Sequence, residues 1–216
     1  MDYSAQKKYF HIAYRTGSDH WTKTVLPFRD TVLAERLAPN SLILDLGSGR
    51  GRFPFDLVKR GFRVIGIDYV GEVVKKNNHE VKLLGLDKNL RFMEADALDI
   101  PLSDASFDAV TDVGLIQHVA KQDWAQYIGE ISRVLKPGGY CLLAALSKET
   151  SRYLTWTPKS DANPSYEREG VLYYFFTGAE IALLFQNAFD LVSFKVEYTS
   201  DREPIAYITV LMKKKA

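Results

Sequence analysis

Five apolar segments of strand length, with helical patterns between them, constrain this sequence most. Four run over residues 41–47, 62–68, 90–96 and 107–113, and a fifth runs over 139–146. They are rich in Val, Ile and Leu, as expected of strands that are covered on both faces. Strands that alternate with helices form a parallel sheet with right-handed crossovers and helices on both faces. The sequence therefore predicts an α/β fold.

The segment between the fourth and fifth predicted strands, 122–135, has the clearest helical pattern. Its apolar residues follow the three-and-four spacing of one helix face: Trp124, Tyr127, Ile128, Ile131, Val134 and Leu135. Residues 136–139, Lys-Pro-Gly-Gly, come next. We expect them to stop the helix and to form the tight turn into the next strand, because proline cannot continue a helix.

The chain ends with a different pattern. Residues 190–199 and 205–212 alternate polar with apolar side chains and are joined by the short turn Ser-Asp-Arg-Glu-Pro. This arrangement is typical of an antiparallel hairpin. We therefore expect a mixed sheet with an antiparallel strand near its end.

We expect a single domain over residues 1–216, with four parts. Residues 1–38 form an aromatic-rich helical cap, 39–146 the core of alternating strands and helices, 147–176 a lid or insert, and 177–216 a C-terminal helix and β-hairpin. The lid is inferred because a connection so long and aperiodic inside a compact domain is usually functional or disordered, and its aromatic side chains favour function.

Composition excludes several classes of protein. The 28 basic and 27 acidic side chains nearly balance, so no global field attracts nucleic acid or an anionic membrane, and the terminal Lys-Lys-Lys is interpreted as a solvated end. The sequence contains no apolar run of the ~18 residues that a membrane span needs and no signal-peptide core at its start. A single cysteine, Cys141, excludes disulfides, and no metal site is expected. We expect a cytoplasmic protein.

A glycine loop follows the first predicted strand. Residues 42–51 read Leu-Ile-Leu-Asp-Leu-Gly-Ser-Gly-Arg-Gly. The dinucleotide fingerprint requires its third glycine at position 52, which is Arg52, and the phosphate loop requires Gly-Lys-Ser/Thr, which is absent here. Asp45 would repel a pyrophosphate and attract a cationic ligand. The alternative is that Asp45 caps amides of the turn.

Two further acids end predicted strands. Asp68 is placed to accept hydrogen bonds from the two ribose hydroxyls of an adenosine cofactor. Asp96 is placed to accept from the exocyclic amine of adenine, with the Ala97 amide available to the ring. The alternative for Asp96 is a helix cap or a turn.

The motifs L-D-L-G-S-G-R-G, G-I-D-Y, A-D-A-L-D-I-P, F-D-A-V and R-V-L-K-P-G-G-Y, in that order over about residues 40–146, resemble a known family. They are similar to those of the class I (Rossmann-like) S-adenosylmethionine-dependent methyltransferases, in particular the small-molecule subgroup. The resemblance implies a Rossmann-like three-layer sandwich whose seven-stranded sheet is mostly parallel, with an antiparallel last strand. It implies S-adenosylmethionine as cofactor and S-adenosylhomocysteine as product.

The resemblance also implies roles for individual residues. Asp45 and the loop residues Gly47, Ser48, Gly49 and Gly51 would hold the methionine end of the cofactor. Asp68 would hold the ribose, Asp96 and Ala97 the adenine, and the Tyr69 ring would stack on it. Backbone carbonyls of Asp112, Val113 and Gly114 would face the ammonium, and Gln117 and His118 would line the methyl side. Trp21 is placed to contact the sulfonium, because aromatic faces attract cations. The alternative for Trp21 is packing onto the core.

The acceptor side is less defined. His118 could be a general base, a residue that orients the substrate, or a histidine that is structural or contacts the cofactor. Candidates for contact with the substrate are Tyr14, His20, Tyr153, Trp156, Tyr173 and Tyr174. The alternative for these aromatic residues is ordinary packing.

The predicted activity is in-line transfer of the cofactor's methyl group to a small-molecule acceptor. Alternatives are a protein or RNA methyltransferase and a catalytically silent partner protein. A nicotinamide-dependent oxidoreductase is disfavoured by Asp45 and Arg52. The identity of the acceptor atom, O, N or S, and the oligomeric state cannot be read from the sequence, because fold and cofactor do not fix the substrate.

Overall fold

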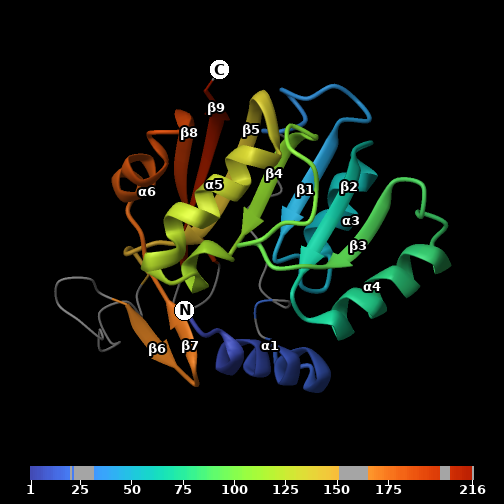
Figure 1. Ribbon diagram of the computed structural model, residues 1–216, viewed down its shortest axis with the longest axis horizontal. Coiled ribbons are helices and arrows are strands. Elements are labelled where there is room, and N and C mark those ends of the chain that lie inside the picture. Colours follow the sequence, from blue (N-terminus) through green and yellow to red (C-terminus); the bar gives the residue numbers. More distant parts are fainter. Residues whose placement is uncertain (20, 22–31, 151–164, 200–204, 216) are drawn as a thin grey trace.

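The computed structural model of the chain describes residues 1–19, 21, 32–150, 165–199 and 205–215. Its centre is a seven-stranded sheet in the order β3-β2-β1-β4-β5-β9-β8 (Figure 1). The strands are β1 Leu42–Leu46, β2 Arg63–Asp68, β3 Leu90–Glu94, β4 Phe107–Val113, β5 Leu135–Leu146, β8 Phe189–Tyr198 and β9 Ala206–Lys214. The five neighbouring strands β3, β2, β1, β4 and β5 pair in parallel. Strand β9 is antiparallel to both β5 and β8. The expected sheet, mostly parallel with an antiparallel last strand, is confirmed.

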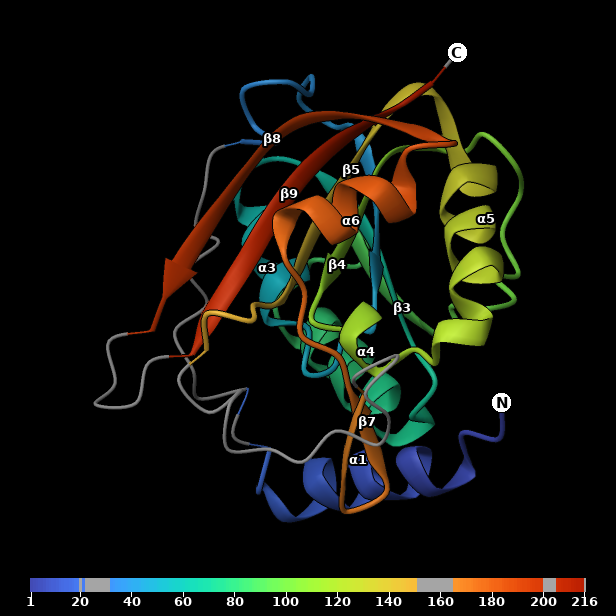
Figure 2. The same cartoon turned by 90° about the vertical axis from the view of Figure 1, so that its left-hand side faces the viewer.

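Helices cover both faces of the sheet. Helices α5 (Trp124–Val134) and α6 (Gly178–Phe185) pack on one face, and α3 (Arg52–Lys59) and α4 (Gly71–Leu83) contribute to the core on the other. Figure 2 shows α5 and α3 on opposite sides of the strands. Successive side chains of a strand point to opposite faces, so Leu44 of β1 joins the first core and Ile43 the second. The sheet and the two layers of helices form the expected three-layer sandwich.

The junction between α5 and β5 differs from the prediction. Helix α5 ends at Val134 and β5 begins at once at Leu135, so residues 136–139 lie inside the strand. Phe107 of β4 pairs with Leu135, whereas Ala109 pairs with Tyr140. The Lys-Pro-Gly-Gly segment is therefore a bulge in the ladder, because β4 is long enough to pair with β5 on both sides of it.

Two smaller elements lie beyond the carboxyl ends of the parallel strands. Helix α1 (Ser4–Thr16) and the hairpin of β6 (Tyr166–Arg168) and β7 (Val171–Tyr173) are side by side there in both views (Figures 1 and 2). Within residues 1–38 the structure describes helix in α1 and at Trp21 and turns over 32–36, so the cap as a whole stays a prediction. The hairpin was not predicted, because strands of three residues are too short to show periodicity.

The C-terminal lysines are not simply solvated, as had been expected. Lys214 Nζ donates to the backbone oxygens of Ser132 and Leu135, at 2.6 and 2.8 Å, and Lys215 Nζ donates to that of Gln186 at 2.7 Å. Lysines near helix C-termini satisfy the last carbonyl groups and interact favourably with the helix dipole. In the described part of the chain, no helix combines the length and apolarity needed to cross a bilayer.

Candidate active site

The glycine loop lies at the carboxyl end of β1, between β1 and α3. Gly47, Gly49 and Gly51 have φ of 63°, 50° and 73°, the left-handed region that favours glycine. A Cβ atom on Gly49 would lie 2.7 Å from Tyr14 Oη, and one on Gly51 would lie 2.6 Å from the Phe92 ring. Backbone geometry and close contacts therefore both require glycine here.

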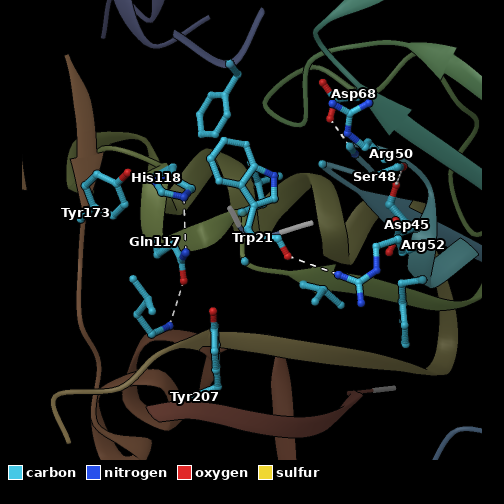
Figure 3. Close-up of a pocket in the computed structure, with 18 of the residues that line it drawn as sticks. Trp21, Asp45, Ser48, Arg50, Arg52, Asp68, Gln117, His118, Tyr173 and Tyr207 are labelled. Atoms are coloured by element: carbon cyan, nitrogen blue, oxygen red, sulfur yellow. Dashed lines mark hydrogen bonds between the residues drawn. The ribbon is translucent and has the colours of Figure 1, made fainter. Parts of the chain in front are cut away.

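A cavity of about 270 Å³ opens beside this loop. Its walls come from the loop, the end of β4 and the η1 turn (Ile116–His118), and from α1, β5, β7 and β9. Figure 3 shows Asp45, Ser48 and Asp68 on one side of Trp21, with Gln117, His118 and Tyr173 on the other. We call this space the main cavity.

A second cavity of about 50 Å³ adjoins the first. The two share the lining residues Gly47, Asp68, Tyr69, Leu115 and His118. The second is bordered further by Asp96 and Ala97. Asp68 is therefore part of the wall that the two adjoining cavities share, near the ends of β1, β2 and β4. We call the two cavities together the cleft.

Asp45 is a buried acid at the wall of the main cavity. Its side chain is 2% exposed, and its Oδ1 accepts a hydrogen bond from Thr111 Oγ1 at 2.6 Å. Burial raises the pKa of this carboxyl to about 7. Among the described residues it forms no ion pair and caps no amide of the turn, so the turn-capping alternative is not supported.

Asp68 ties the loop to β2. Its two oxygens accept from the backbone amides of Gly49 and Val70, each at 2.9 Å. Burial raises the pKa of the Asp68 carboxyl to about 6, although these amides oppose the shift. The neighbouring hydroxyl of Tyr69 is buried without a hydrogen-bond partner of good geometry among the described residues.

Asp112 is not among the residues that line either cavity, and the expected contact of its backbone carbonyl with the ammonium stays a prediction. Its carboxylate accepts from Tyr127 Oη at 2.6 Å and from the amides of Leu115 and Ile116 at 2.6 and 2.9 Å, and its side chain lines neither cavity. The Asp112 carboxylate thus holds the turn after β4 through its amides. Val113 and Gly114, the next two residues, do line the main cavity, as predicted from the sequence.

His118 lines both cavities, and both of its ring nitrogens are engaged. Nδ1 lies 2.7 Å from the carbonyl oxygen of Leu172, and Nε2 lies 3.3 Å from Gln117 Nε2. Burial lowers the pKa of His118 to about 4. The imidazole is therefore neutral near pH 7, with Nδ1 as the donor because a carbonyl only accepts.

Helix α1 is clamped over the loop by Arg50. The guanidinium donates to both carboxylate oxygens of Asp19, at 2.6 and 2.7 Å, and to the carbonyl oxygen of Tyr14 at 2.8 Å. Asp19 is 2% exposed. A guanidinium that donates to both oxygens of one carboxylate forms an ion pair of specific geometry. The contacts of Arg50 hold α1 and the residues after it against the loop, where Phe10, Tyr14 and Trp21 line the main cavity.

The predicted substrate residues divide into three groups. Tyr14 and Tyr173 line the main cavity. Tyr174 does not, because its ring packs against Trp124 and Phe176 on the other side of the β7 segment. His20, Tyr153 and Trp156 lie outside the described residues.

Several lining residues had no role in the sequence interpretation. They are Phe10, Arg50, Phe53, Leu115, Leu146, Thr150, Phe175, Ile205 and Tyr207, and Arg52 had been used only to argue against a dinucleotide site. Phe10 belonged to the aromatic-rich start of the chain, which was a usable signal. Ile205 and Tyr207 follow the C-terminal turn and carry no local signal, since only the pairing of β9 with β5 brings them to the cavity.

Comparison with known proteins shows a matching domain and a shared fold. Residues 44–143 match the family model of the methyltransferase domain. The chain is 32% identical over 134 residues to phosphoethanolamine N-methyltransferase 1 of Triticum aestivum, which covers 61% of this chain and 26% of that protein. It is 31% identical over 161 residues to the tRNA (carboxymethyluridine(34)-5-O)-methyltransferase of Arabidopsis thaliana, which covers 72% and 37%. The chain thus spans less than half the length of either relative.

A solved structure has the same fold over nearly the whole chain. It is the 1,6-didemethyltoxoflavin-N1-methyltransferase of Burkholderia thailandensis with bound 1,6-didemethyltoxoflavin and S-adenosylhomocysteine. The TM-score is 0.80 at 22% identity, over 99% of this chain and 88% of that one. Residues 44–143 thus match a methyltransferase domain, and the chain shares the fold of a methyltransferase that binds S-adenosylhomocysteine.

Proposed function

We propose that the protein transfers a methyl group from S-adenosylmethionine to a small-molecule acceptor by in-line displacement. The observation that carries the proposal is that two adjoining cavities share the wall that contains Asp68. Two adjoining cavities can hold an adenosine cofactor on one side and leave room for an acceptor on the other.

The side chains at the cofactor end fit this group. Asp45 is a buried acid without an ion pair among the described residues, so a cationic ammonium would supply the missing partner. Asp68 and the Tyr69 hydroxyl, which lacks a hydrogen bond of good geometry among the described residues, lie where ribose hydroxyls and a ring nitrogen can complete their hydrogen bonds. Asp96 and Ala97 border the narrow cavity, which we assign to adenine. The Asp96 carboxylate also closes its own turn through the Leu98 amide at 2.8 Å.

When bound, the cofactor supplies an electrophilic methyl group on a sulfonium. The residues of this chain then bind and orient the partners and exclude water, which accounts for most of the rate enhancement in such a transfer. Phe10, Tyr14 and Trp21 cover the main cavity from α1 and the residues after it. Aromatic faces attract cations, so this cover suits a sulfonium.

The acceptor end favours a small molecule. Leu146, Phe175, Ile205 and Tyr207 give it apolar and aromatic walls, with the Thr150 hydroxyl among them. A concave apolar pocket with a few polar groups is typical of small-molecule sites. A single buried thiol, Cys141, is compatible with the reducing cytoplasm, where we place the enzyme.

The test is incubation with methyl-labelled S-adenosylmethionine and a cell extract, which is then separated into small molecules, proteins and nucleic acids. We expect label in the small-molecule fraction. Label confined to a macromolecular fraction would overturn the acceptor class, and no label in any fraction would count against the activity.

Cofactor binding is tested separately by calorimetry with S-adenosylhomocysteine. We expect Asp68→Ala to reduce its affinity by at least a hundredfold, because two hydrogen bonds to an ionised group are lost at about 1.5 to 3 kcal/mol each. NADH serves as the control ligand and is expected not to bind. An Asp68→Ala variant with unchanged affinity for S-adenosylhomocysteine would disprove the ribose assignment.

A further inference from the structure

Three distant segments meet at one residue of β7, Leu172. Its amide donates to Gln6 Oε1 of α1 at 3.1 Å, and its carbonyl accepts from His118 Nδ1 at 2.7 Å. Gln6 Nε2 in turn donates to the backbone carbonyl of His118 at 3.1 Å. All three side chains are at most 8% exposed. The hydrogen bonds therefore close a buried ring between α1, the η1 turn and β7.

Gln117 fixes the orientation of the imidazole in this ring. The Leu146 amide donates to Gln117 Oε1 at 2.8 Å, so the Gln117 amide nitrogen faces His118 (Figure 3). That nitrogen is a donor, and His118 Nε2 must accept from it. The carbonyl of Gln117 accepts from the Tyr174 amide at 2.8 Å, which adds a second attachment to the β7 segment.

On the footing of the methyltransferase activity proposed above, we propose that His118 is a positioning residue. With Gln6, it fixes β7 and the Tyr173 wall of the main cavity against the turn that borders the cofactor end. We call these bonds among Gln6, His118 and Leu172 the Leu172 clasp. In this role His118 does not remove a proton from the acceptor, because its Nε2 lone pair is directed at Gln117.

The clasp acts on both ends of the cleft. Tyr173 directly follows Leu172, and its ring contacts the imidazole edge to face at 4.8 Å between centroids, while Phe10 contacts it at 5.4 Å. Since His118 lines both cavities, a displacement of β7 changes the distance between the acceptor wall and the cofactor end. A misplacement of about 1 Å can reduce a transfer rate by about a hundredfold.

Two substitutions separate the positioning role from the base role. The amide nitrogen of asparagine takes the place of Nδ1, so His118→Asn keeps the donor to Leu172. The amide of glutamine reaches toward the position of Nε2, so His118→Gln loses that donor. Neither variant can act as a base. The hydrogen bond from side chain 118 to the Leu172 carbonyl survives only in His118→Asn.

The primary measurement is hydrogen exchange of the Leu172 and Tyr174 amides by NMR, on the full chain without ligand. We expect His118→Asn to stay within about threefold of the native protection and His118→Gln to lose roughly tenfold, the effect of one buried hydrogen bond. Gln6→Met acts on the clasp from α1 and is expected to lose protection similarly. His79→Gln, at an exposed histidine of α4, is the control.

The second measurement is the rate of label transfer from S-adenosylmethionine to the small-molecule fraction. We expect the Asn variant to retain a larger share of the native rate than the Gln variant. Equal loss of transfer in both variants with native exchange, or equal exchange in both, would overturn the positioning role. If the native protein transfers no label, the activity proposal fails, while the exchange pattern still decides whether the clasp exists.

Discussion

At the scale of single residues, Asp45 carries a carboxyl group that is costly to ionise in the folded chain. Burial raises its pKa from 3.8 to about 7. Between these two pH values the folded state binds a proton that the unfolded state does not, so the free energy of unfolding falls as pH rises. The stabilisation by this proton is fully present below pH 3.8 and is lost as pH rises through 7.

Asp45→Asn removes the titrating carboxyl group and keeps an oxygen that can accept the hydrogen bond from Thr111 Oγ1. We expect the ligand-free variant to be more stable than the native protein at pH 8, by on the order of 2 to 4 kcal/mol, with the difference shrinking toward pH 4. Urea unfolding at a series of pH values measures it. A pH-independent difference between the two proteins would contradict the assignment of the raised pKa to Asp45.

Gly49 offers a second prediction at this scale, with Gly61 as a matched control. Both have positive φ, but a Cβ on Gly61 has nothing within 4 Å, whereas one on Gly49 meets Tyr14 Oη. We expect Gly61→Ala to cost about 1 to 2 kcal/mol from backbone strain alone. Gly49→Ala is expected to cost about 1 to 3 kcal/mol more from overpacking and to weaken S-adenosylhomocysteine binding. Thermal melts and calorimetry measure both; equal losses in the two variants would show that Tyr14 does not press on the loop.

The residues that could be predicted from the sequence are those whose position is set by their own strand. Asp45 and Asp68 end buried strands, so the sheet places them at one edge. Asp112 was expected to face the ammonium through its backbone carbonyl, but it lines neither cavity. Its carboxylate is held by Tyr127 and two amides, and such partners have no local signal. The same holds for Gln6, whose burial depends on Leu172, 166 residues away.

At the scale of elements, α1 depends on the Arg50 clamp for its position over the loop. Arg50→Lys keeps the charge but loses the two-pronged contact with Asp19 and the bond to the Tyr14 carbonyl. We expect faster hydrogen exchange throughout α1 and roughly tenfold weaker S-adenosylhomocysteine binding, since each lost bond to a charged group costs about 1.5 to 3 kcal/mol.

The control for this prediction is Arg91→Lys, at an exposed arginine of β3. It is expected to leave exchange in α1 and ligand affinity unchanged. Native-like exchange in α1 of the Arg50→Lys variant would mean that packing of the α1 aromatic residues, and not the clamp, holds the helix.

Elements with long periodic patterns were predictable, and short ones were not. The parallel strands and α5 were identified because burial on both faces, or on one helix face, leaves a pattern over many residues. The β6–β7 hairpin has three residues in each strand and gains its stability from α1 and the η1 turn. The bulge in β5 depends on the length of β4, which the Lys-Pro-Gly-Gly motif itself does not encode.

At the scale of the whole molecule, ligand binding and proton binding are linked. The cleft brings the carboxyl groups of Asp45 and Asp68 to one ligand, and burial raises their pKa values to about 7 and about 6. A cationic ammonium beside Asp45 favours its charged form, so binding lowers its pKa. The ligand-free protein therefore releases a proton on binding wherever Asp45 starts protonated.

We expect about 0.5 proton released from Asp45 per S-adenosylhomocysteine bound at pH 7, rising to about 0.9 at pH 6 and falling to about 0.1 at pH 8. Asp68 adds to the release mainly at the acid end, because its pKa is the lower of the two. Calorimetric enthalpies in two buffers of different ionisation enthalpy give the number directly, and Asp45→Asn removes the component centred at pH 7. Adenosine, which contains the ribose and adenine but no ammonium, is the matched ligand control and is expected to leave that component unreleased. Equal release with adenosine and with S-adenosylhomocysteine would mean that Asp45 does not face the ammonium, and that the methionine end of the cofactor lies elsewhere in the cleft.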